Sequence, residues 1–429
     1  MNIENLHQLF LQQQQNFTTD TRKIEKDSIF FALKGANFNG NEFAEKALEL
    51  GASYVVIDEK QFAKNEKYIL VDDVLTTLQN LATFHRQQFS IPVLCIGGSN
   101  GKTTTKELVS KVLAEKYIVH TTAGNFNNHI GVPITLLKMP LDTEVAVIEI
   151  GANHLLETKF LCSIALPNFG LITNNGKDHL EGFGDIEGVK KANAELFDFL
   201  KTIDGSAFVN AGDVDLKNAS VGLQQIFYSD NLQVGCFGSI EKSFPFLKAK
   251  VRINKEEFSI QSQLNGNYNL INILAAAAVG SYFSVTNEQI QKAIEEYKPA
   301  NNRSQLIEKN GNQFIVDCYN ANPSSMKLAI ESFAEMPVEN KIVIVGDMFE
   351  LGNHSGFEHL QIAHQLNNSS FEKIIIVGKE FAKLKDKFNH FISFETTTEL
   401  KQWMNEQQFT NHTFLLKASR GMALEKLLD

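Results

Sequence analysis

The stretch Ile91-Pro-Val-Leu-Cys-Ile-Gly-Gly-Ser-Asn-Gly-Lys-Thr-Thr-Thr105 is followed by a helical pattern from Lys106 to about Glu115. Its apolar segment, Val93 to Ile96, ends at two glycines, and the apolar residues beyond the loop recur on one face of a helix. The sequence therefore predicts a strand, a glycine-rich loop and a helix in that order.

This order suits the binding of a phosphate group. The loop N–H groups and the helix N-terminus attract anions, the Lys102 ammonium can reach outer phosphates, and the Thr103 hydroxyl can hold Mg²⁺. The common pattern has glycine five residues before Gly101, where Ile96 stands, so the loop is a variant. The alternative is a tight turn that binds nothing. The Gly-Lys-Thr triplet favours a nucleoside triphosphate, and the expected binding residues are Gly98, Ser99, Asn100, Gly101, Lys102, Thr103 and Thr104.

Composition narrows the class of protein. A chain of 429 residues suggests about three domains, at about 150 residues per domain. The net charge of −10 makes nucleic acid and anionic membranes poor partners, so phosphate must be bound by local cationic groups. The four cysteines have no C-x-x-C spacing, and the N-terminus lacks the features of a signal peptide. We expect a monomer in the cytoplasm with small-molecule substrates, no nucleic acid and no membrane.

The patterns divide the chain into three α/β domains, residues 1–88, residues 89–299 and residues 300–429. The first mixes short strands with helices and contains two polar loops, Asp20-Thr21-Arg22 and Lys34-Gly35. Taken alone, both loops are more typical of turns than of binding sites.

Strands of the central region end in polar residues, among them Glu149 and His179. Open parallel sheets bind ligands beyond the carboxyl ends of their strands, so we expect a central parallel sheet with its site at that edge. Glu149 belongs to an apolar strand, where a carboxylate is costly unless it meets a cation or a donor. Bound Mg²⁺ would satisfy it. The alternatives are a buried ion pair for Glu149 and an ordinary loop position for His179.

The third region alternates strands and helices again, which predicts a doubly wound, Rossmann-like sheet. The expected strands are Gln313 to Cys318, Lys341 to Gly346, Lys373 to Gly378 and Thr413 to Lys417. Polar residues again follow the strands, including Asp317, Asp347 and Lys417 with Ser419-Arg420. Lys298 to Arg303 is the expected hinge, because Pro299 breaks the preceding helix.

Five further motifs occur in order along the chain: Gly124-Asn-Phe-Asn-Asn-His-Ile-Gly-Val-Pro133, Glu149-Ile-Gly-Ala-Asn-His154, His179-Leu-Glu-Gly-Phe-Gly184, Asp317-Cys-Tyr-Asn-Ala-Asn-Pro323 and Gly346-Asp-Met-Phe-Glu-Leu-Gly352. With the shortened phosphate loop, they resemble the Mur ligases of peptidoglycan synthesis, and in particular the branch that adds a dipeptide. The N-terminal region resembles the UDP-binding domain of that family, although Asn41 stands where histidine is frequent.

The resemblance implies ATP and Mg²⁺ as cofactors. Lys102 would bind the ATP phosphates, and Thr103 with Glu149 would hold the Mg²⁺ that bridges the β- and γ-phosphates. His179 with Glu149 would hold a second Mg²⁺. The catalytic residues implied in this way are Lys102, Glu149, His179 and Arg303.

Further roles follow from the same resemblance. Asn269 and Asn272 would meet the adenine, Asp317 the ribose, and Arg303 the γ-phosphate from across the hinge. The residues implied for the UDP-substrate and the dipeptide are Asp20, Thr21, Arg22, Lys34, Asn125, Asn127, Asn128, Tyr319, Asn320, Asn322 and Asp347.

The implied reaction is amide formation between UDP-N-acetylmuramoyl-tripeptide and D-Ala-D-Ala. A carboxylate is a poor electrophile, so ATP would first convert it to an acyl phosphate, and cations would screen the repulsion between the two anions. One alternative is a sister ligase that adds a single amino acid, or glutamate to folate; Tyr319-Asn-Ala-Asn-Pro323 argues against it. The other is a binding protein that has lost turnover.

One helix departs from the family pattern. Most members carry a carbamylated lysine where Asn193 stands, in Asn193-Ala-Glu-Leu-Phe197. Lys190 lies on the same helical face, but its side chain tilts toward the helix N-terminus and away from position 193. We therefore predict that no carbamate forms and that the Asn193 amide oxygen, directly or through water, serves as a weaker, neutral ligand of the second Mg²⁺.

Overall fold

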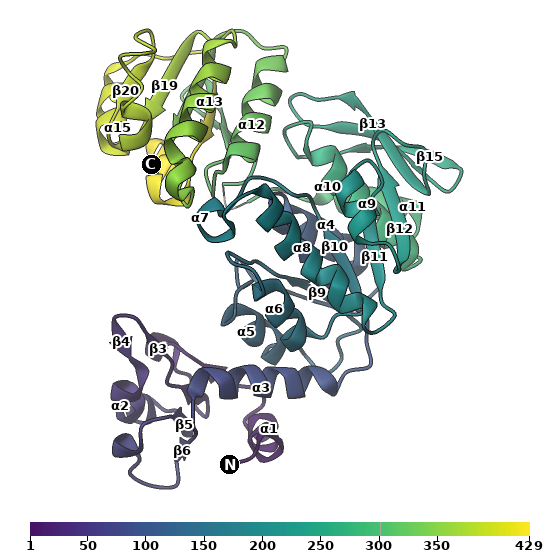
Figure 1. Cartoon of the computed structure of the whole chain (residues 1–429), viewed down its shortest axis with the longest axis vertical. Coiled ribbons are helices and arrows are strands. Elements are labelled where there is room, and N and C mark those ends of the chain that lie inside the picture. The colour runs from purple at the N-terminus through teal and green to yellow at the C-terminus, as the bar shows by residue number, and fades with distance from the viewer. Residues whose placement is uncertain (301) are drawn as a thin grey trace. The chain divides into compact units, whose positions relative to one another are not determined.

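The computed structural model describes residues 1–300 and 302–429 (Figure 1). The expected hinge, Lys298 to Arg303, includes residue 301 and so lies partly outside the described residues. The described chain forms two compact units. The first unit comprises Met1–Cys95, Ile118–Gly151 and Lys159–Asn168, and the second comprises Ile96–Tyr117, Ala152–Thr158 and Phe169–Asp429.

The first unit begins with a small parallel sheet in the order β1-β2-β5-β6. Its strands are β1 (Phe17–Thr18), β2 (Ile29–Phe31), β5 (Tyr54–Ile57) and β6 (Tyr68–Leu70). Val55 and Ile57, two residues apart on β5, lie on the same face of the sheet and pack in one core cluster with residues of helix α2. A short hairpin and several helices complete this part: β3 (Lys34–Gly35), β4 (Phe38–Asn39), α1 (Ile3–Gln12), α2 (Ala44–Glu49), α3 (Val74–Gln87), η1 (Thr21–Lys23), η2 (Gly40–Phe43) and η3 (Lys60–Phe62).

The first unit also contains a parallel pair, β8 (Val119–Thr121) and β9 (Val145–Glu149), and helix α5 (Gly131–Leu137), which packs against α3. Helix α6 (Glu157–Ala165) follows β9 in the chain. Strand β9 is buried along its whole length, which explains its continuous apolar run with Glu149 at its end.

Strand β7 (Val93–Gly97) leads through the glycine-rich loop into α4 (Lys102–Ala114), as the sequence predicts. The other strands of this region are β10 (Phe169–Ile172), β11 (Ser206–Asn210), β12 (Gln224–Ser229), β13 (Cys236–Lys242), β14 (Lys248–Ile253) and β15 (Glu256–Gln261). The helices are α7 (Leu180–Phe183), α8 (Ile186–Lys201), α9 (Val214–Ala219), α10 (Asn269–Tyr282) and α11 (Asn287–Glu296).

The central sheet is parallel in part, as expected, and antiparallel at one edge, so it is mixed. Strands β10 to β13 pair in parallel, whereas β13, β14 and β15 pair antiparallel. A two-residue turn joins β14 to β15, with Asn254 at φ +57°, a conformation that asparagine tolerates better than most residues. The turn reads Asn-Lys and lacks the glycine that usually marks such a hairpin.

The C-terminal sheet has the order β16-β17-β21-β18-β19-β20 and is parallel except for the β16–β17 pair. Its strands are β16 (Gln305–Lys309), β17 (Asn312–Val316), β18 (Lys341–Gly346), β19 (Lys373–Val377), β20 (Ile392–Phe394) and β21 (Thr413–Lys417). Its helices are α12 (Pro323–Glu335), α13 (Ser355–Asn367), α14 (Lys379–Ala382), α15 (Thr397–Glu406), η4 (Gly352–His354), η5 (Arg420–Met422) and η6 (Leu424–Leu428).

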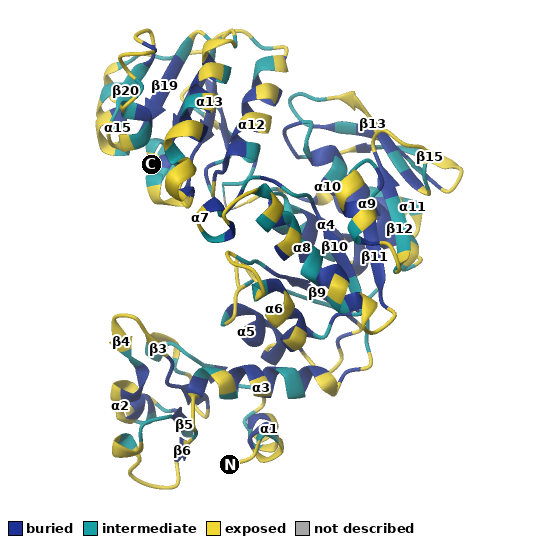
Figure 2. Cartoon of the chain, in the orientation of Figure 1, coloured by how far each residue is buried: buried dark blue, intermediate teal, exposed yellow. Residues whose placement is uncertain are grey.

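Both faces of this sheet are covered, which confirms the doubly wound arrangement. Val343 and Val345 belong to one core cluster with residues of α12 and α13, and Ile342 and Ile344 belong to another with Leu400 of α15. Figure 2 shows the buried strands between helices whose outer faces are exposed. Alternating residues of one strand therefore fill two different cores, as expected for a buried parallel strand.

All four cysteines are buried and form no disulfide. Burial raises the pKa of the thiols of Cys95, Cys236 and Cys318 to about 12. None of the helices in the described residues has the length and apolar content that crossing a bilayer requires.

Candidate active site

Two glycines of the phosphate loop occupy positions that other residues would not fit. Gly98 has φ +112°, and a Cβ there would lie 2.4 Å from Thr173 Oγ1. Gly101 has φ +81°, caps the N-terminus of α4, and would place a Cβ 2.7 Å from Asn272 Oδ1. Both sites combine left-handed backbone with close packing, so the glycines are required by the local structure.

Lys102 turns back onto its own loop. Its Nζ donates to the carbonyl oxygens of Gly98, at 2.5 Å, and Ser99, at 3.0 Å. Ser99 Oγ lies 2.5 Å from Asp178 Oδ1. Thr103 is buried at the start of α4, and Thr104 follows it in the same turn. The loop thus presents an ammonium and a helix N-terminus together, which is the arrangement that binds phosphate oxygens.

Side-chain amides connect this loop to its surroundings. Asn100 donates its backbone N–H to Asn174 Oδ1, and Asn174 Nδ2 donates to the carbonyl oxygen of Asn100, at 3.2 and 2.8 Å. Asn322, the N-cap of α12, donates from Nδ2 to Asn100 Oδ1 at 2.8 Å. Asn322 therefore contacts the phosphate loop, and its predicted contact with substrate stays a prediction.

Glu149 ends strand β9 in the first unit and is 1% exposed. Its Oε1 accepts a hydrogen bond from Asn127 Nδ2 at 2.8 Å. Asn125 accepts the backbone N–H of Asn127, and Asn128 Oδ1 accepts two backbone N–H groups at the start of α5. The structure thus brings Asn127 and Glu149 together, whereas the Asn128 side chain caps a helix.

His179 adopts a left-handed conformation, φ +46°, at the N-terminus of α7. Its Nδ1 lies 2.8 Å from Glu350 Oε2, and this contact holds the pKa of Glu350 below its ordinary value. Two residues earlier, Lys177 pairs with Glu358 at 2.6 Å. Glu350 and Glu358 were missed from the sequence, although Glu350 lies inside the Gly346 to Gly352 motif.

Asn269 and Asn272 begin helix α10 and are 2% and 5% exposed. Asn272 Nδ2 donates to Asn269 Oδ1 at 2.9 Å, and Asn272 Oδ1 accepts from Thr105 Oγ1 at 3.1 Å. Asn269 Nδ2 donates to the carbonyl oxygen of Asn265. In this structure the two amides brace α4 and the phosphate loop, and the predicted contact with adenine stays a prediction.

Asp317, which follows β17, forms an ion pair of 2.8 Å with the buried Lys417, which ends β21. Lys417 also donates to the carbonyl oxygen of Asn320 at 3.0 Å. The Arg303 guanidinium stacks on the ring of Tyr319, with its Cζ 3.7 Å from the ring centroid. These predicted residues therefore gather at the carboxyl ends of two neighbouring strands.

Asp347 follows β18 and is 4% exposed. Its carboxylate accepts the backbone N–H groups of Glu380 and Phe381 at 2.9 and 3.0 Å, which caps the first turn of α14. The predicted contact of Asp347 with the dipeptide is untested, but both oxygens already have backbone partners.

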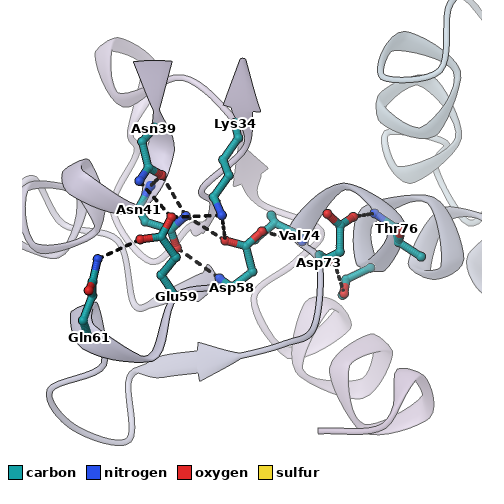
Figure 3. Close-up of polar contacts among 10 residues, drawn as sticks. Lys34, Asn39, Asn41, Asp58, Glu59, Gln61, Asp73, Val74 and Thr76 are labelled. Carbon is teal, nitrogen blue, oxygen red and sulfur yellow. Dashed lines mark hydrogen bonds and ion pairs between the residues drawn. The ribbon is translucent and has the colours of Figure 1, made fainter. Parts of the chain in front are cut away.

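A cluster of polar side chains surrounds Asp58 and Glu59, which come directly after strand β5 of the N-terminal sheet (Figure 3). Lys34 Nζ lies 2.9 Å from Asp58 Oδ1 and 2.9 Å from Glu59 Oε1. The fully buried Asn41 donates from Nδ2 to Asp58 Oδ1 at 2.8 Å and to Asn39 Oδ1 at 2.9 Å, and accepts the N–H of Asp58. Burial raises the pKa of Asp58, but the hydrogen bonds from Lys34 and Asn41 outweigh it and lower that pKa overall.

The other predicted loop of this region is held by a local ion pair. The Asp20 carboxylate accepts hydrogen bonds from the Arg22 guanidinium and backbone N–H at 2.8 to 3.0 Å. These bonds lower the pKa of Asp20 to about 2. Thr21 begins the short helix η1 between them.

Asn193 lies on α8, where its Nδ2 donates to Asn175 Oδ1 at 2.9 Å. The Lys190 ammonium forms ion pairs with Glu187 and Asp215, at 2.8 and 2.9 Å, which raise its pKa. Carbamylation needs a neutral amine, so these pairs disfavour a carbamate on Lys190.

The donor set also bears on Mg²⁺. Among residues 1–300 and 302–429, no group of three or more histidine, cysteine, aspartate and glutamate side chains is placed to hold a metal. The Thr103 hydroxyl and the Glu149 carboxylate are nevertheless oxygen ligands of the kind that Mg²⁺ prefers. With Nδ1 of His179 facing Glu350, only Nε2 of that ring is left to contact a ligand.

A glycine-rich loop with Lys102 and Thr103, between a buried strand and a helix, defines a nucleotide-binding α/β protein. Comparison of the sequence with known protein families identifies the family. Residues 96–280 match the Mur ligase middle domain, residues 302–420 the Mur ligase glutamate ligase domain, and residues 15–86 the Mur ligase family catalytic domain. The chain belongs to the Mur ligase family.

Full-length relatives share this organisation. The UDP-N-acetylmuramoyl-tripeptide–D-alanyl-D-alanine ligases of Bacillus subtilis and Escherichia coli are 34% and 33% identical, over 96% of this chain and 91% and 92% of theirs. A crystal structure of MurF from Acinetobacter baumannii has a TM-score of 0.88 and 27% identity, covering 98% of this chain and 97% of that one. MurF ligase from Thermotoga maritima in complex with ADP has a TM-score of 0.86 and 26% identity, covering 96% of each chain.

Proposed function

We propose that this protein is an ATP-dependent ligase that joins D-Ala-D-Ala to UDP-N-acetylmuramoyl-tripeptide in peptidoglycan precursor synthesis. The observation that carries the proposal is similarity along the whole chain to ligases of that activity, together with the phosphate loop at Gly98 to Thr103. The proposed domains are residues 1–88 for the UDP-substrate, 89–299 for ATP and 300–429 for the dipeptide. We further propose a monomer that works in the cytoplasm.

The reaction requires activation of the tripeptide carboxylate. We propose that Lys102 leaves the carbonyl oxygens of Gly98 and Ser99 to bind the phosphates of ATP, and that Arg303 leaves Tyr319 to meet the γ-phosphate. Each cation is held in the structure by weak or neutral partners, which a phosphate oxygen can replace. The acyl phosphate formed on the substrate then reacts with the dipeptide amine.

Mg²⁺ belongs to the same proposal. Thr103 and Glu149 would supply oxygen ligands for one ion, and His179 and Asn193 would supply ligands for a second. Bound Mg²⁺ neutralises charge on the phosphates as they are transferred. Asp317 would bind the ribose, and Asn269 and Asn272 support the phosphate loop from α10. The residues proposed for substrates remain Asp20, Thr21, Arg22, Lys34, Asn125, Asn127, Asn128, Tyr319, Asn320, Asn322 and Asp347.

Release of inorganic phosphate from ATP tests the function. We expect release only when Mg²⁺, the UDP-tripeptide and D-Ala-D-Ala are all present. Turnover with a single amino acid in place of the dipeptide would instead identify a sister ligase. Binding of the UDP-tripeptide without phosphate release under any condition would identify a protein that has lost turnover, for which the missing lysine at Asn193 is the specific indication.

A further inference from the structure

Two arginines share one aromatic ring in the C-terminal sheet. The Cζ atom of Arg303 lies 3.7 Å from the ring centroid of Tyr319, and that of Arg420 lies 4.9 Å from the same centroid. The whole chain has only five arginines. Arg303 and Tyr319 already have proposed roles, whereas Arg420 has none.

The sheet explains why these side chains meet. Strands β17 and β21 are parallel neighbours with Val316 opposite Leu416, so their carboxyl ends lie side by side. Tyr319 and Arg420 each follow three residues after the end of their strand, and the Asp317–Lys417 ion pair joins the two ends. Ligands of doubly wound sheets bind in the crevice beyond such strand ends.

The charge at this place is unbalanced. The Lys417 ammonium is matched by Asp317, but in the described part of the chain neither guanidinium has a carboxylate partner. For an exposed guanidinium such as that of Arg420, stacking on a ring contributes only about 0.5–1 kcal/mol. Two positive charges on one ring, in a chain of net charge −10, make the carboxyl ends of these two strands a site for an anion.

The backbone under Arg420 is fixed although its side chain is exposed. Ser419 is 1% exposed, and its Oγ accepts the Phe349 N–H at 2.9 Å. Gly421 lies so close to Phe349 that a Cβ would be 2.5 Å from the ring. Phe349 itself is 45% exposed. A guanidinium and an open aromatic ring beside it suit a small ligand that carries both a carboxylate and methyl groups.

We propose that Arg420 binds the terminal carboxylate of the incoming dipeptide, while Arg303 serves the phosphate. This inference rests on the proposed function, which makes D-Ala-D-Ala the acceptor. An extended dipeptide spans about 7 Å, so its amine can reach the acyl phosphate while its carboxylate stays at a second cation. A planar guanidinium matches a carboxylate with two parallel hydrogen bonds, which an ammonium cannot do.

Kinetics with a matched pair of dipeptides test this assignment. The full-length protein is assayed with D-Ala-D-Ala and with D-Ala-D-alaninamide, in which a neutral amide replaces the carboxylate. For the wild type we expect kcat/KM to fall about 100-fold or more with the amide, because the site then has an unpaired cation. Arg420→Gln should lose a similar factor with D-Ala-D-Ala, mainly in KM, and should no longer distinguish the two dipeptides.

Two further variants complete the experiment. Arg420→Lys should recover part of the preference for the carboxylate, because it restores the charge without the planar fork. Arg252→Gln is the matched control, since Arg252 also stacks on an aromatic ring, Phe237, at 5.5 Å but lies on strand β14 of the central sheet. It should behave like the wild type with both dipeptides.

The opposite results overturn the proposal. If Arg420→Gln keeps the full preference for the free carboxylate, another group binds it. If Arg420→Gln instead raises the KM of ATP and leaves that of the dipeptide unchanged, Arg420 serves phosphate. Failure of the proposed function gives a different result, because the wild type would then not turn over D-Ala-D-Ala at all.

Discussion

Replacing Asn41 by alanine tests whether this buried amide holds the polar cluster of the N-terminal sheet. The change removes the donor to Asp58 Oδ1 and leaves the backbone N–H of Asp58 without its acceptor. A buried donor left unsatisfied costs about 1–3 kcal/mol, and a hydrogen bond to a charged group contributes about 1.5–3 kcal/mol. We expect the local free energy of unfolding to fall by about 3 kcal/mol. This value is at the lower end of the sum of the two contributions, because water can enter the space that the Asn41 side chain leaves.

Hydrogen exchange measured by mass spectrometry locates the loss. Peptides covering β2, β5 and β6 should exchange about 100-fold faster in Asn41→Ala, because 1.4 kcal/mol corresponds to a factor of ten. Asn65→Ala is the control, since Asn65 is an exposed turn residue of the same region and should shift exchange little. Unchanged exchange in Asn41→Ala would refute the argument that Asn41 fixes Asp58.

The nearly isosteric Asn41→Asp adds a pH dependence. It places a second carboxylate beside Asp58, so one of the two must have a raised pKa. An acid whose folded pKa is raised destabilises the fold above its unfolded pKa, so the penalty should be large at pH 7 and shrink toward pH 4. The stability of the wild type should change with pH in the opposite direction, decreasing as the pH falls. The lowered pKa of Asp58 contributes stability at neutral pH that is lost as the pH falls through that pKa.

Four other predictions concern turnover and substrate binding. Lys102→Ala should lower kcat by about 10³-fold or more, and near-normal phosphate release would contradict its role. Arg303→Lys should impair acyl-phosphate formation severely, and a loss within about threefold would show that Arg303 is misassigned. Calorimetry should find weak D-Ala-D-Ala binding without ATP and the UDP-substrate, because the dipeptide site is completed last; tight binding to the bare protein would contradict this order. Activity should persist in CO₂-depleted buffer at raised Mg²⁺, and rescue of a depleted enzyme by bicarbonate would show that a lysine is carbamylated after all.

Much of the fold could be predicted because its strands are buried and continuous. The expected bounds of β18 and β21 agree with the structure, since each is an apolar run bounded by polar residues. The antiparallel part from β13 to β15 was missed, because its strands carry alternating charges and its turn has no glycine. The expected parallel pairing holds for β10 to β13, including β12 and β13, which no helix separates in the described part of the chain.

The candidate active site could be predicted only where its residues lie close together in the sequence. The phosphate loop follows from local sequence, because glycine, lysine and threonine act within one turn. The partners of His179 and Lys177 did not follow, because Glu350 and Glu358 come from more than 160 residues away in the chain. Asn322 is the clearest example. Its amide reaches Asn100 of the phosphate loop, 222 residues away in the chain, and its predicted contact with substrate stays a prediction.

The four buried cysteines determine how the protein can be labelled and how it resists oxidants. Thiolate is the reactive form of cysteine, and burial keeps Cys95, Cys236 and Cys318 protonated at neutral pH. A single cysteine introduced at an exposed residue should therefore react with maleimide dyes far faster than the native thiols. Energy transfer between two such dyes could then follow movement of the C-terminal sheet during turnover, and no native cysteine would have to be removed.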